Sequence, residues 1–441
     1  MLKLLNLLAA YWHARHTTFN DRAGLEKYQT ARLQAHMNWL SRKSPYFKRF
    51  GAPDRTAKDA RALLQRYPLM NKETMMANFD QMVTADLQIA QIMALAGRAE
   101  STRDFQATLN GHTVGLSSGT SAMRGAFVVS DREKAKWAGT ILAKLLPAGL
   151  FAGERVALFL RADSGLYQAV KTPWLTFRFF DLVSNFPERV RELEAYQPTI
   201  LVAPAQVLRQ LALRVTQEGL SLRPKKVVSV AEVLEPADRQ LLRAAFGEVI
   251  HEVYQATEGF LASSCEHGTL HLNEEYVHFE KEWVDKEQTR FVPVITDFTR
   301  RTQPIVRYRL NDVLVVKPGL CACGRVTQTI EAIEGRCDDM LILRTWSGAA
   351  VPVFADAVSR VLAQALPHQA DYRLVQETGN VLQLSADTTQ GELVRARDHL
   401  VAKFTEMGAV TDVLTWELST TLPPFNPMVK RRRIIRNPGI V

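Results

Sequence analysis

The sequence predicts an α/β protein with a large N-terminal domain and a small α+β C-terminal domain. Between 130 and 254, short β-branched runs alternate with helical segments, which is typical of βαβ units on a largely parallel sheet. Between 276 and 317, strand-like runs follow one another without a helical segment, so we expect an antiparallel sheet or small barrel there. A separate series of strands and helices occupies 340–418.

The N-terminal domain is expected to begin with helices. Its first hundred residues are mainly helical in pattern, and the first helix is amphipathic and packs on the body of the protein. Ser130 and Glu133 form a capping box that opens a helix over 134–146. The expected elements that follow are a strand over 155–160, a helix over 187–195, a strand over 199–203, a helix over 206–218, a strand over 226–230, a helix over 236–246 and a strand over 249–254.

The later elements divide the chain in two. Strands are expected over 291–297, 305–309 and 313–316. Beyond the segment Gly335–Asp339, the pattern predicts a strand over 340–344, a helix over 353–365, strands over 372–377 and 381–386, a helix over 392–407 and a strand over 412–418. We therefore expect two domains. The first, 1–336, consists of layered α/β sheets with an antiparallel part, and the second, 337–441, is a small α+β unit.

Composition narrows the class of protein and its partners. The 441 residues are 46% hydrophobic and 23% charged, which is typical of a globular protein, and the formal net charge is +9. This charge favours anionic partners, whether nucleic acid, a membrane surface, phosphorylated ligands or an acidic carrier protein. No apolar run approaches the roughly 20 residues of a membrane span. Lys3 and Asn6 interrupt the apolar start, so we expect no signal peptide, a cytoplasmic location and reduced cysteines.

Three segments carry polar groups suited to a nucleotide. The loop over 116–125 is rich in glycine and hydroxyl groups, so its backbone N–H groups and hydroxyls can surround an anion, although it lacks the Gly-Lys-Ser/Thr ending of a Walker loop. Thr257 and Glu258 follow a strand at the edge where open α/β sheets hold ligands. Asp312 can accept hydrogen bonds from two ribose hydroxyls. For each segment, a plain surface turn is the alternative.

The cysteines form a separate pattern. Cys321 and Cys323 are two residues apart, and Cys265 precedes His267 and His271. Three thiolates and one imidazole match a tetrahedral zinc site, with His271 as the preferred fourth ligand and His267 as its alternative. The other interpretation is a reduced cysteine pair in a loop.

The order of these segments resembles the adenylate-forming (acyl-AMP synthetase) superfamily, and within it the clade of phenylacetate–CoA ligase and coenzyme F390 synthetase. The resemblance covers roughly 40–436. The segments that carry it are the Ser-Ser-Gly-Thr-Ser loop at 117–121, Tyr254–Glu258, Tyr308–Asp312, Gly335–Leu341 as the hinge signature, and Lys430 at the place of the C-terminal catalytic lysine.

The resemblance implies that ATP and a carboxylic acid give an acyl-adenylate and pyrophosphate. The acyl group then passes to a thiol of CoA or of an acidic acyl-carrier protein. The resemblance implies that the phosphates are surrounded by Ser117, Ser118, Gly119, Thr120, Ser121 and Arg124, that Thr257 contacts the α-phosphate and that Glu258 binds Mg²⁺. It places Tyr254, Ala231 and Glu232 beside the adenine, and Asp312 and Arg336 at the ribose. Lys430 would contact the reacting carboxylate and phosphate, and Asp338 would be the hinge of a mobile lid. Related proteins also raise the expectation of structural zinc at Cys265, His271, Cys321 and Cys323.

Several alternatives stay open at this stage. The acid pocket is expected along 159–167 and 228–231, where Tyr167, Trp174 and Phe177 favour an aromatic acid unless they are core residues. An adenylyltransferase of the F390 synthetase kind, which moves AMP onto a hydroxyl, is the second function. An inactive relative is a third, because Ala122–Arg124 replaces the family's Gly-Lys-Pro. Nucleic acid is not an expected partner, and a homodimer is left open.

Overall fold

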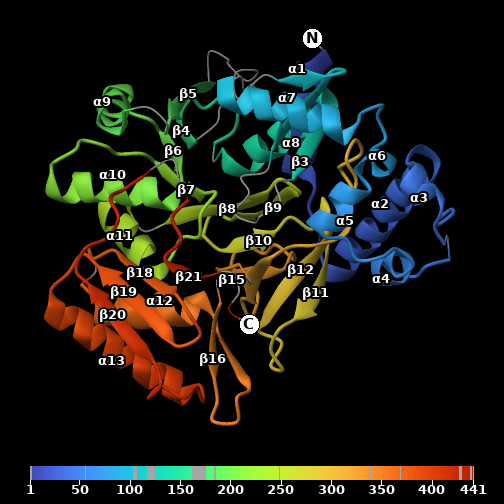
Figure 1. Ribbon diagram of the computed structural model, residues 1–441. Coiled ribbons are helices and arrows are strands. Elements are labelled where there is room, and N and C mark those ends of the chain that lie inside the picture. The colour runs from blue at the N-terminus through green and yellow to red at the C-terminus, as the bar shows by residue number, and fades with distance from the viewer. Residues whose placement is uncertain are drawn as a thin grey trace.

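The structure of the protein is a computed structural model with two parts, shown in Figure 1. The N-terminal part, 2–336, carries one extended sheet, and the C-terminal part, 340–440, lies below it in the view. The described residues are 2–54, 56–102, 107–116, 125–146, 148–160, 175–182, 185–247, 249–336, 340–367, 369–426, 430–437 and 440. Within these ranges no helix has both the length and the apolar character needed to cross a membrane.

Helices occupy most of the first hundred residues, as predicted. They are α1 (Leu2–His16), α2 (Arg22–Lys43), α3 (Pro45–Lys48), α4 (Ala60–Leu64), α5 (Lys72–Ala77), α6 (Phe79–Met82) and α7 (Ile89–Thr102). The long helix α2 begins after Asp21, whose side chain accepts a hydrogen bond from the Gly24 N–H. Leu33, Met37 and Leu40 on its buried face pack into a core shared with the later antiparallel strands.

A small antiparallel sheet precedes the main one. Its strands are β1 (Thr108–Leu109), β2 (His112–Leu116) and β3 (Ala126–Ser130). Ser130 then opens α8 (Asp131–Leu145). Its side chain accepts a hydrogen bond from the Glu133 N–H, and the Glu133 carboxylate accepts one from the Ser130 N–H, so the predicted capping box is confirmed.

The parallel half of the main sheet confirms the predicted βαβ pattern. Its neighbouring strands run in the order β5 (Leu175–Asp181), β4 (Glu154–Leu160), β6 (Ile200–Ala203), β7 (Lys226–Val230) and β8 (Ile250–Ala256). The helices are α9 (Phe186–Tyr196), α10 (Ala205–Gln217) and α11 (Pro236–Phe246). Because the strands are parallel, the carboxyl ends of β6, β7 and β8 lie at one edge of the sheet.

The antiparallel half is a continuation of the same sheet. Its strands are β9 (Gly259–Ser264), β10 (Leu270–Leu272), β11 (Val277–Trp283), β12 (Arg290–Asp297), β13 (Ile305–Arg309), β14 (Asp312–Val316) and β15 (Thr329–Arg336). Hydrogen bonds connect β8 to β9, β10, β15, β14, β12 and β11 in turn, so 12 strands of the described chain form one sheet, with β13 paired to β12. We expected these strands beside the parallel layer. They join it because β9 folds back directly on β8.

The C-terminal part has its own sheet and core. A hairpin of β16 (Leu341–Arg344) and β17 (Ala350–Val353) precedes a four-stranded sheet in the order β20 (Thr415–Ser419), β19 (Val381–Ala386), β18 (Tyr372–Gln376) and β21 (Ile434–Arg436). Two helices pack with these strands, α12 (Ala355–Ala365) and α13 (Gln390–Glu406). Helix α12 begins two residues after the expected start, because Val353 is paired with Leu341 in the hairpin. The boundary at 336/337 stays a prediction, since 337–339 lie outside the described residues.

The first helix lies against α8, as the sequence predicts. Gly139 of α8 is the point of closest approach. A Cβ atom built there would lie 2.3 Å from the Leu7 carbonyl oxygen and 2.8 Å from the Tyr11 nitrogen. These distances are too short for any side chain, and the crowded atoms belong to the α1 backbone, which cannot rotate away.

We therefore predict that Gly139→Ala destabilises the protein. In an exposed helix the same change adds about 0.5–1 kcal/mol to the free energy of unfolding. At Gly139 overpacking should remove about 1–3 kcal/mol instead. Urea unfolding measures the difference. Gly97→Ala is the matched control, because Gly97 lies in α7 with no atom near its Cβ position, and its variant should gain stability. Equal effects at the two positions would contradict the close contact of α1 with α8.

Candidate functional site

A large cavity opens at the carboxyl edge of the parallel strands. Its volume is about 2290 Å³, and residues of both parts of the chain line it. Of the site residues predicted from the sequence, the described ones in its wall are Ala231, Glu232, Tyr254, Thr257, Glu258, Asp312, Arg336 and Lys430. They come from the ends of β7, β8, β14 and β15 and from the C-terminal loop. Folding therefore brings together groups that are up to about two hundred residues apart in the chain.

Tyr254 and Asp312 form the polar centre of this wall. The Tyr254 hydroxyl donates a hydrogen bond of 2.6 Å to Asp312 Oδ2. Asp312 stands directly opposite Arg336 in the pairing of β14 with β15. Burial raises the pKa of the Asp312 carboxyl above its ordinary value, while the hydrogen bond from Tyr254 and the charges of Arg336 and Lys430 act in the opposite direction. A carboxylate beside cationic side chains and a phenol is suited to binding neighbouring hydroxyl groups.

Thr257 and Glu258 make the turn between β8 and β9. Ala256 pairs with Gly259, so only two residues separate the strands. The Thr257 hydroxyl donates to Glu258 Oε2 at 2.9 Å. A Cβ atom at Gly259 would lie 3.1 Å from an Asp297 carboxylate oxygen, so a residue without a side chain suits this position. The turn places a hydroxyl and a carboxylate, the groups that contact phosphate and Mg²⁺, in the wall of the cavity.

The turn after β7 lies at the same edge. Ala231 has a φ of 65°, which is unusual for a residue with a Cβ atom. The Glu232 carboxylate accepts hydrogen bonds from the Gln206 backbone N–H at 3.1 Å and from the Gln206 side chain at 2.8 Å. Gln206 is in the first turn of α10, so Glu232 stabilises the start of that helix as well as lining the cavity.

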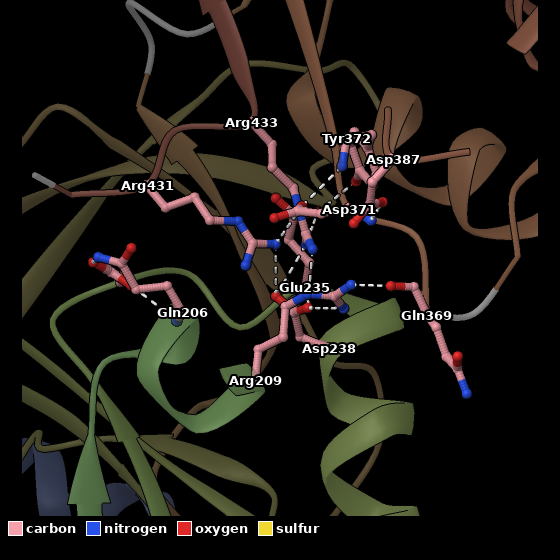
Figure 2. A network of polar contacts seen from close by, with 11 residues as sticks. Gln206, Arg209, Glu235, Asp238, Gln369, Asp371, Tyr372, Asp387, Arg431 and Arg433 are labelled. Atoms are coloured by element: carbon pink, nitrogen blue, oxygen red, sulfur yellow. Dashed lines mark hydrogen bonds and ion pairs between the residues drawn. The ribbon is translucent and has the colours of Figure 1, made fainter. Parts of the chain in front are cut away.

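All four residues of the basic run 430–433 line the cavity. The charge of Lys430 acts on Asp312. Arg431 and Arg433 make ion pairs with Asp238 of α11. The charge of Lys430 thus acts on the polar centre, while the guanidinium of Arg433 is engaged at α11 (Figure 2).

Some predicted residues lie outside the described part of the chain. They are Ser117, Ser118, Gly119, Thr120, Ser121, Arg124, Tyr167, Trp174 and Asp338. The ends of the first loop are described, since Leu116 ends β2 and Gly125 precedes β3. Of the expected aromatic walls, Phe177 is described, and it lines the cavity from β5.

Arg300 and Lys136 are among the cations of the cavity wall that sequence reasoning missed. Arg300 donates from Nη1 to the Thr257 carbonyl oxygen at 3.0 Å and from Nη2 to the Val128 carbonyl oxygen at 3.4 Å. It thus connects the β8–β9 turn to the strand that follows the 116–125 loop. Lys136 lies on α8, and burial lowers its pKa to about 8, against the opposing charge of Asp297. The one sequence signal was that Asp297 ends a predicted strand and that Arg300 lies three residues after it.

The predicted cysteine and histidine cluster assembles away from the cavity. The ligand atoms of Cys265, His271, Cys321 and Cys323 all lie within 4.8 Å of one another. The Cys265 and Cys321 sulfurs are 3.7 Å apart, and Cys323 Sγ is 3.4 Å from His271 Nε2. His271 Nδ1 is 3.0 Å from the Thr327 hydroxyl, an arrangement that orients a ligating imidazole. Of the two histidines considered, His271 is the one in the cluster.

Sequence comparison finds a relative over part of the chain. The chain is 26% identical over 195 residues to the phenylacetate-coenzyme A ligase of Thermus thermophilus. The match spans 42% of this chain and 38% of the length of that enzyme. No protein-family model matches the chain.

Structural comparison extends the likeness over almost the whole chain. The crystal structure of 2-hydroxyisobutyryl-CoA ligase in its postadenylation state, in complex with R3-HIB-AMP, matches with a TM-score of 0.70 and 17% identity over 95% of this chain and 90% of that one. The same ligase in its thioesterification state, with 2-HIB-AMP and CoA, matches with a TM-score of 0.57 and 16% identity over 94% and 90%. The predicted fold of a large α/β part with a small α+β part is confirmed.

We predict that Tyr254→Phe lowers the free energy of unfolding by about 1–3 kcal/mol, because the partly buried Asp312 carboxylate loses a hydrogen bond. Urea unfolding measures the loss. Tyr67→Phe is the matched control, since the buried Tyr67 hydroxyl makes no hydrogen bond to any residue that the structure describes, and its removal should be near neutral. If the two variants are equally stable, the Tyr254–Asp312 contact is not formed in solution.

Proposed function

Because the chain has the fold of the adenylate-forming ligases, we propose that it activates a carboxylic acid with ATP and transfers the acyl group to the thiol of CoA. A carboxylate oxygen would attack the α-phosphorus of ATP, and the bond to pyrophosphate would break. The thiol would then attack the acyl carbon, and AMP would leave. The observation that carries the proposal is the meeting of Thr257–Glu258, Asp312–Arg336 and Lys430 in one cavity. The likeness to a phenylacetate-coenzyme A ligase supports the same activity and favours an aromatic acid.

Each group has a chemical task in this proposal. Asp312 and Arg336 would bind the ribose hydroxyls, since they face each other across paired strands. The Thr257 hydroxyl would bind the α-phosphate. Glu258 would hold Mg²⁺, which supplies positive charge between the anionic substrates. Lys430 would neutralise the charge that develops where carboxylate and phosphate meet. Ser117–Ser121, with Arg124, would contact the outer phosphates, and Asp338 would be the hinge.

We further infer that the structure represents the arrangement for the first half-reaction. Its similarity to the postadenylation state of 2-hydroxyisobutyryl-CoA ligase is greater than to the thioesterification state, at nearly equal identity and coverage. The position of Lys430 in the cavity wall agrees with this, because a lysine that assists adenylate formation has to reach the reacting atoms.

The proposed reaction predicts acid-dependent release of pyrophosphate from ATP. Glu258→Gln removes one negative charge and keeps the size of the side chain, so pyrophosphate release should fall by about 100-fold or more. A coupled pyrophosphate assay over a panel of aromatic and aliphatic acids measures it. Glu406→Gln is the control, because Glu406 pairs with Lys403 on an exposed face of α13. An unchanged rate in Glu258→Gln would place the metal elsewhere.

The acceptor decides between the two candidate activities. Mass analysis of the nucleotide product shows AMP and a thioester if CoA is the acceptor. AMP covalently attached to a hydroxyl, without acid-dependent pyrophosphate, would support the F390 synthetase-like alternative and overturn the ligase proposal. A carrier-protein thiol in place of CoA would change the partner and leave the first half-reaction intact.

We also propose that the cysteine and histidine cluster holds a structural Zn²⁺. Three sulfurs and one imidazole nitrogen within 4.8 Å of one another fit a tetrahedral site, and the Thr327 hydroxyl beside His271 Nδ1 leaves Nε2 to face the metal. The cluster connects β10 and the loop after β9 to the loop 321–324. A bound ion would thus join chain segments that are about fifty residues apart.

The zinc proposal predicts about one zinc per chain in protein purified without chelators. Cys321→Ser and His271→Asn should each lower the zinc content several-fold and lower the melting temperature, because a ligand is lost. Elemental analysis and thermal unfolding measure both effects. His267→Asn is the matched control and should keep its zinc. Zinc well below one per chain in the unaltered protein would refute the proposal.

A further inference from the structure

Arg433 is almost completely buried between the two parts of the chain. Its side chain is 2% exposed, and it reaches from the C-terminal part to α11 of the N-terminal part. There Nη1 donates to Glu235 at 2.7 Å and Nη2 donates to Asp238 at 2.9 Å, while Nε donates to Asp371 of its own part at 3.0 Å. Figure 2 shows the guanidinium among these carboxylates.

Other charged groups complete the network. On the side of the N-terminal part, Arg209 of α10 binds Asp238 at 3.2 Å and donates to the Gln369 carbonyl oxygen of the C-terminal part. On the other side, Arg431 binds Asp238 at 3.3 Å. The Tyr372 hydroxyl donates to Glu235 at 2.5 Å, and the Arg433 guanidinium lies 4.7 Å from the centre of the Tyr372 ring. Three of these contacts join one part of the chain to the other: Arg209 with Gln369, Arg431 with Asp238, and Tyr372 with Glu235.

Such a network selects one arrangement of the two parts. Buried ion pairs add little net stability, because desolvation cancels much of their attraction, but a buried charge without its partner is costly. Any displacement that keeps Arg433 buried but moves it away from Glu235 and Asp238 is therefore unfavourable. Complete separation of the two parts is less unfavourable than such a displacement, because water can then solvate the charges. The two acids lie at the start of α11, where the helix dipole also favours negative charge. The network therefore stabilises one arrangement of the two parts and still allows them to separate completely.

The network also fixes the position of Lys430. Three residues of extended chain span at most about 11 Å, so Lys430 cannot lie far from an immobilised Arg433. Arg431, the next residue after Lys430, is held at Asp238 and at Asp371. Both anchors leave Lys430 in the wall of the cavity, where its charge acts on Asp312.

We infer that Arg433 is a positioning residue, and that its ion pairs with Glu235 and Asp238 form a releasable latch that keeps Lys430 at the cavity during the first half-reaction. This inference rests on the proposed function for its kinetic consequence. Its structural consequence is independent of that function: loss of the latch frees the C-terminal part to leave the arrangement described above.

The test replaces the charge on each side of the contact. The variants are Arg433→Gln, Asp238→Asn and the double variant, which removes both buried charges and keeps the fold testable if either single variant unfolds. Arg436→Gln is the control, because Arg436 ends β21, the strand that directly follows Arg433, and lies outside the network. Small-angle X-ray scattering and limited proteolysis report the arrangement without any substrate, and thermal unfolding confirms that each variant is folded.

The latch predicts a larger radius of gyration and faster cleavage between 336 and 341 in the folded latch variants than in the control. It also predicts a 10- to 100-fold lower kcat for acid-dependent pyrophosphate release, with little change in KM for ATP and no loss of thioester formation from added acyl-adenylate. Unchanged scattering, cleavage and first-step kcat in folded variants would overturn the inference. If no acid gives pyrophosphate, the proposed function fails, and scattering and proteolysis alone still decide on the latch.

Discussion

At Thr257 and Glu258 the sheet changes from parallel to antiparallel pairing, because β9 folds straight back on β8 after these two residues. Parallel strands bring their carboxyl ends to one edge, and the reversal places β14 and β15 within reach of the same edge. Asp312 begins one of those strands and Arg336 ends the other. Without the reversal, the two would lie far from the end of β8. The direction in which the strands run therefore decides which residues meet in the cavity wall.

Local signals predicted the elements and many of the site residues. The capping box at Ser130, the alternation of strands with helices and the Cys321–Cys323 spacing each depend on neighbours in the chain, and each is found in the structure as an arrangement of those residues. The sequence allowed His271 to be preferred over His267 as the fourth zinc ligand. The separation of Cys265 and Cys321 along the chain, however, did not show how close they lie in space. The pairing of Asp312 with Arg336 depends on the register of two strands, which no local pattern encodes.

Partners of long side chains were the least predictable feature. All four residues of the run 430–433 are basic, so the sequence alone does not tell which partner each side chain reaches. The ion pairs of Arg431 and Arg433 with α11 follow from where β21 enters its sheet, beside β18, which fixes the path of the preceding loop. Asp238 and Glu235 gave no functional signal, since acids in the first turn of a helix are common. Arg300 was missed because its partners, the carbonyl oxygens of Thr257 and Val128, are distant from it in the chain.

The buried contacts of Arg433 make the two parts of the chain interdependent as building blocks. A hybrid protein that joined this C-terminal part to the N-terminal part of another enzyme would bury the Arg433 guanidinium with Asp371 but without its two partners at α11, unless that enzyme carried acids at the places of Glu235 and Asp238. Substitutions in α11 and in the C-terminal loop should accordingly be tolerated together more often than singly. Modular exchange of such lids thus requires matching of charge as well as of shape.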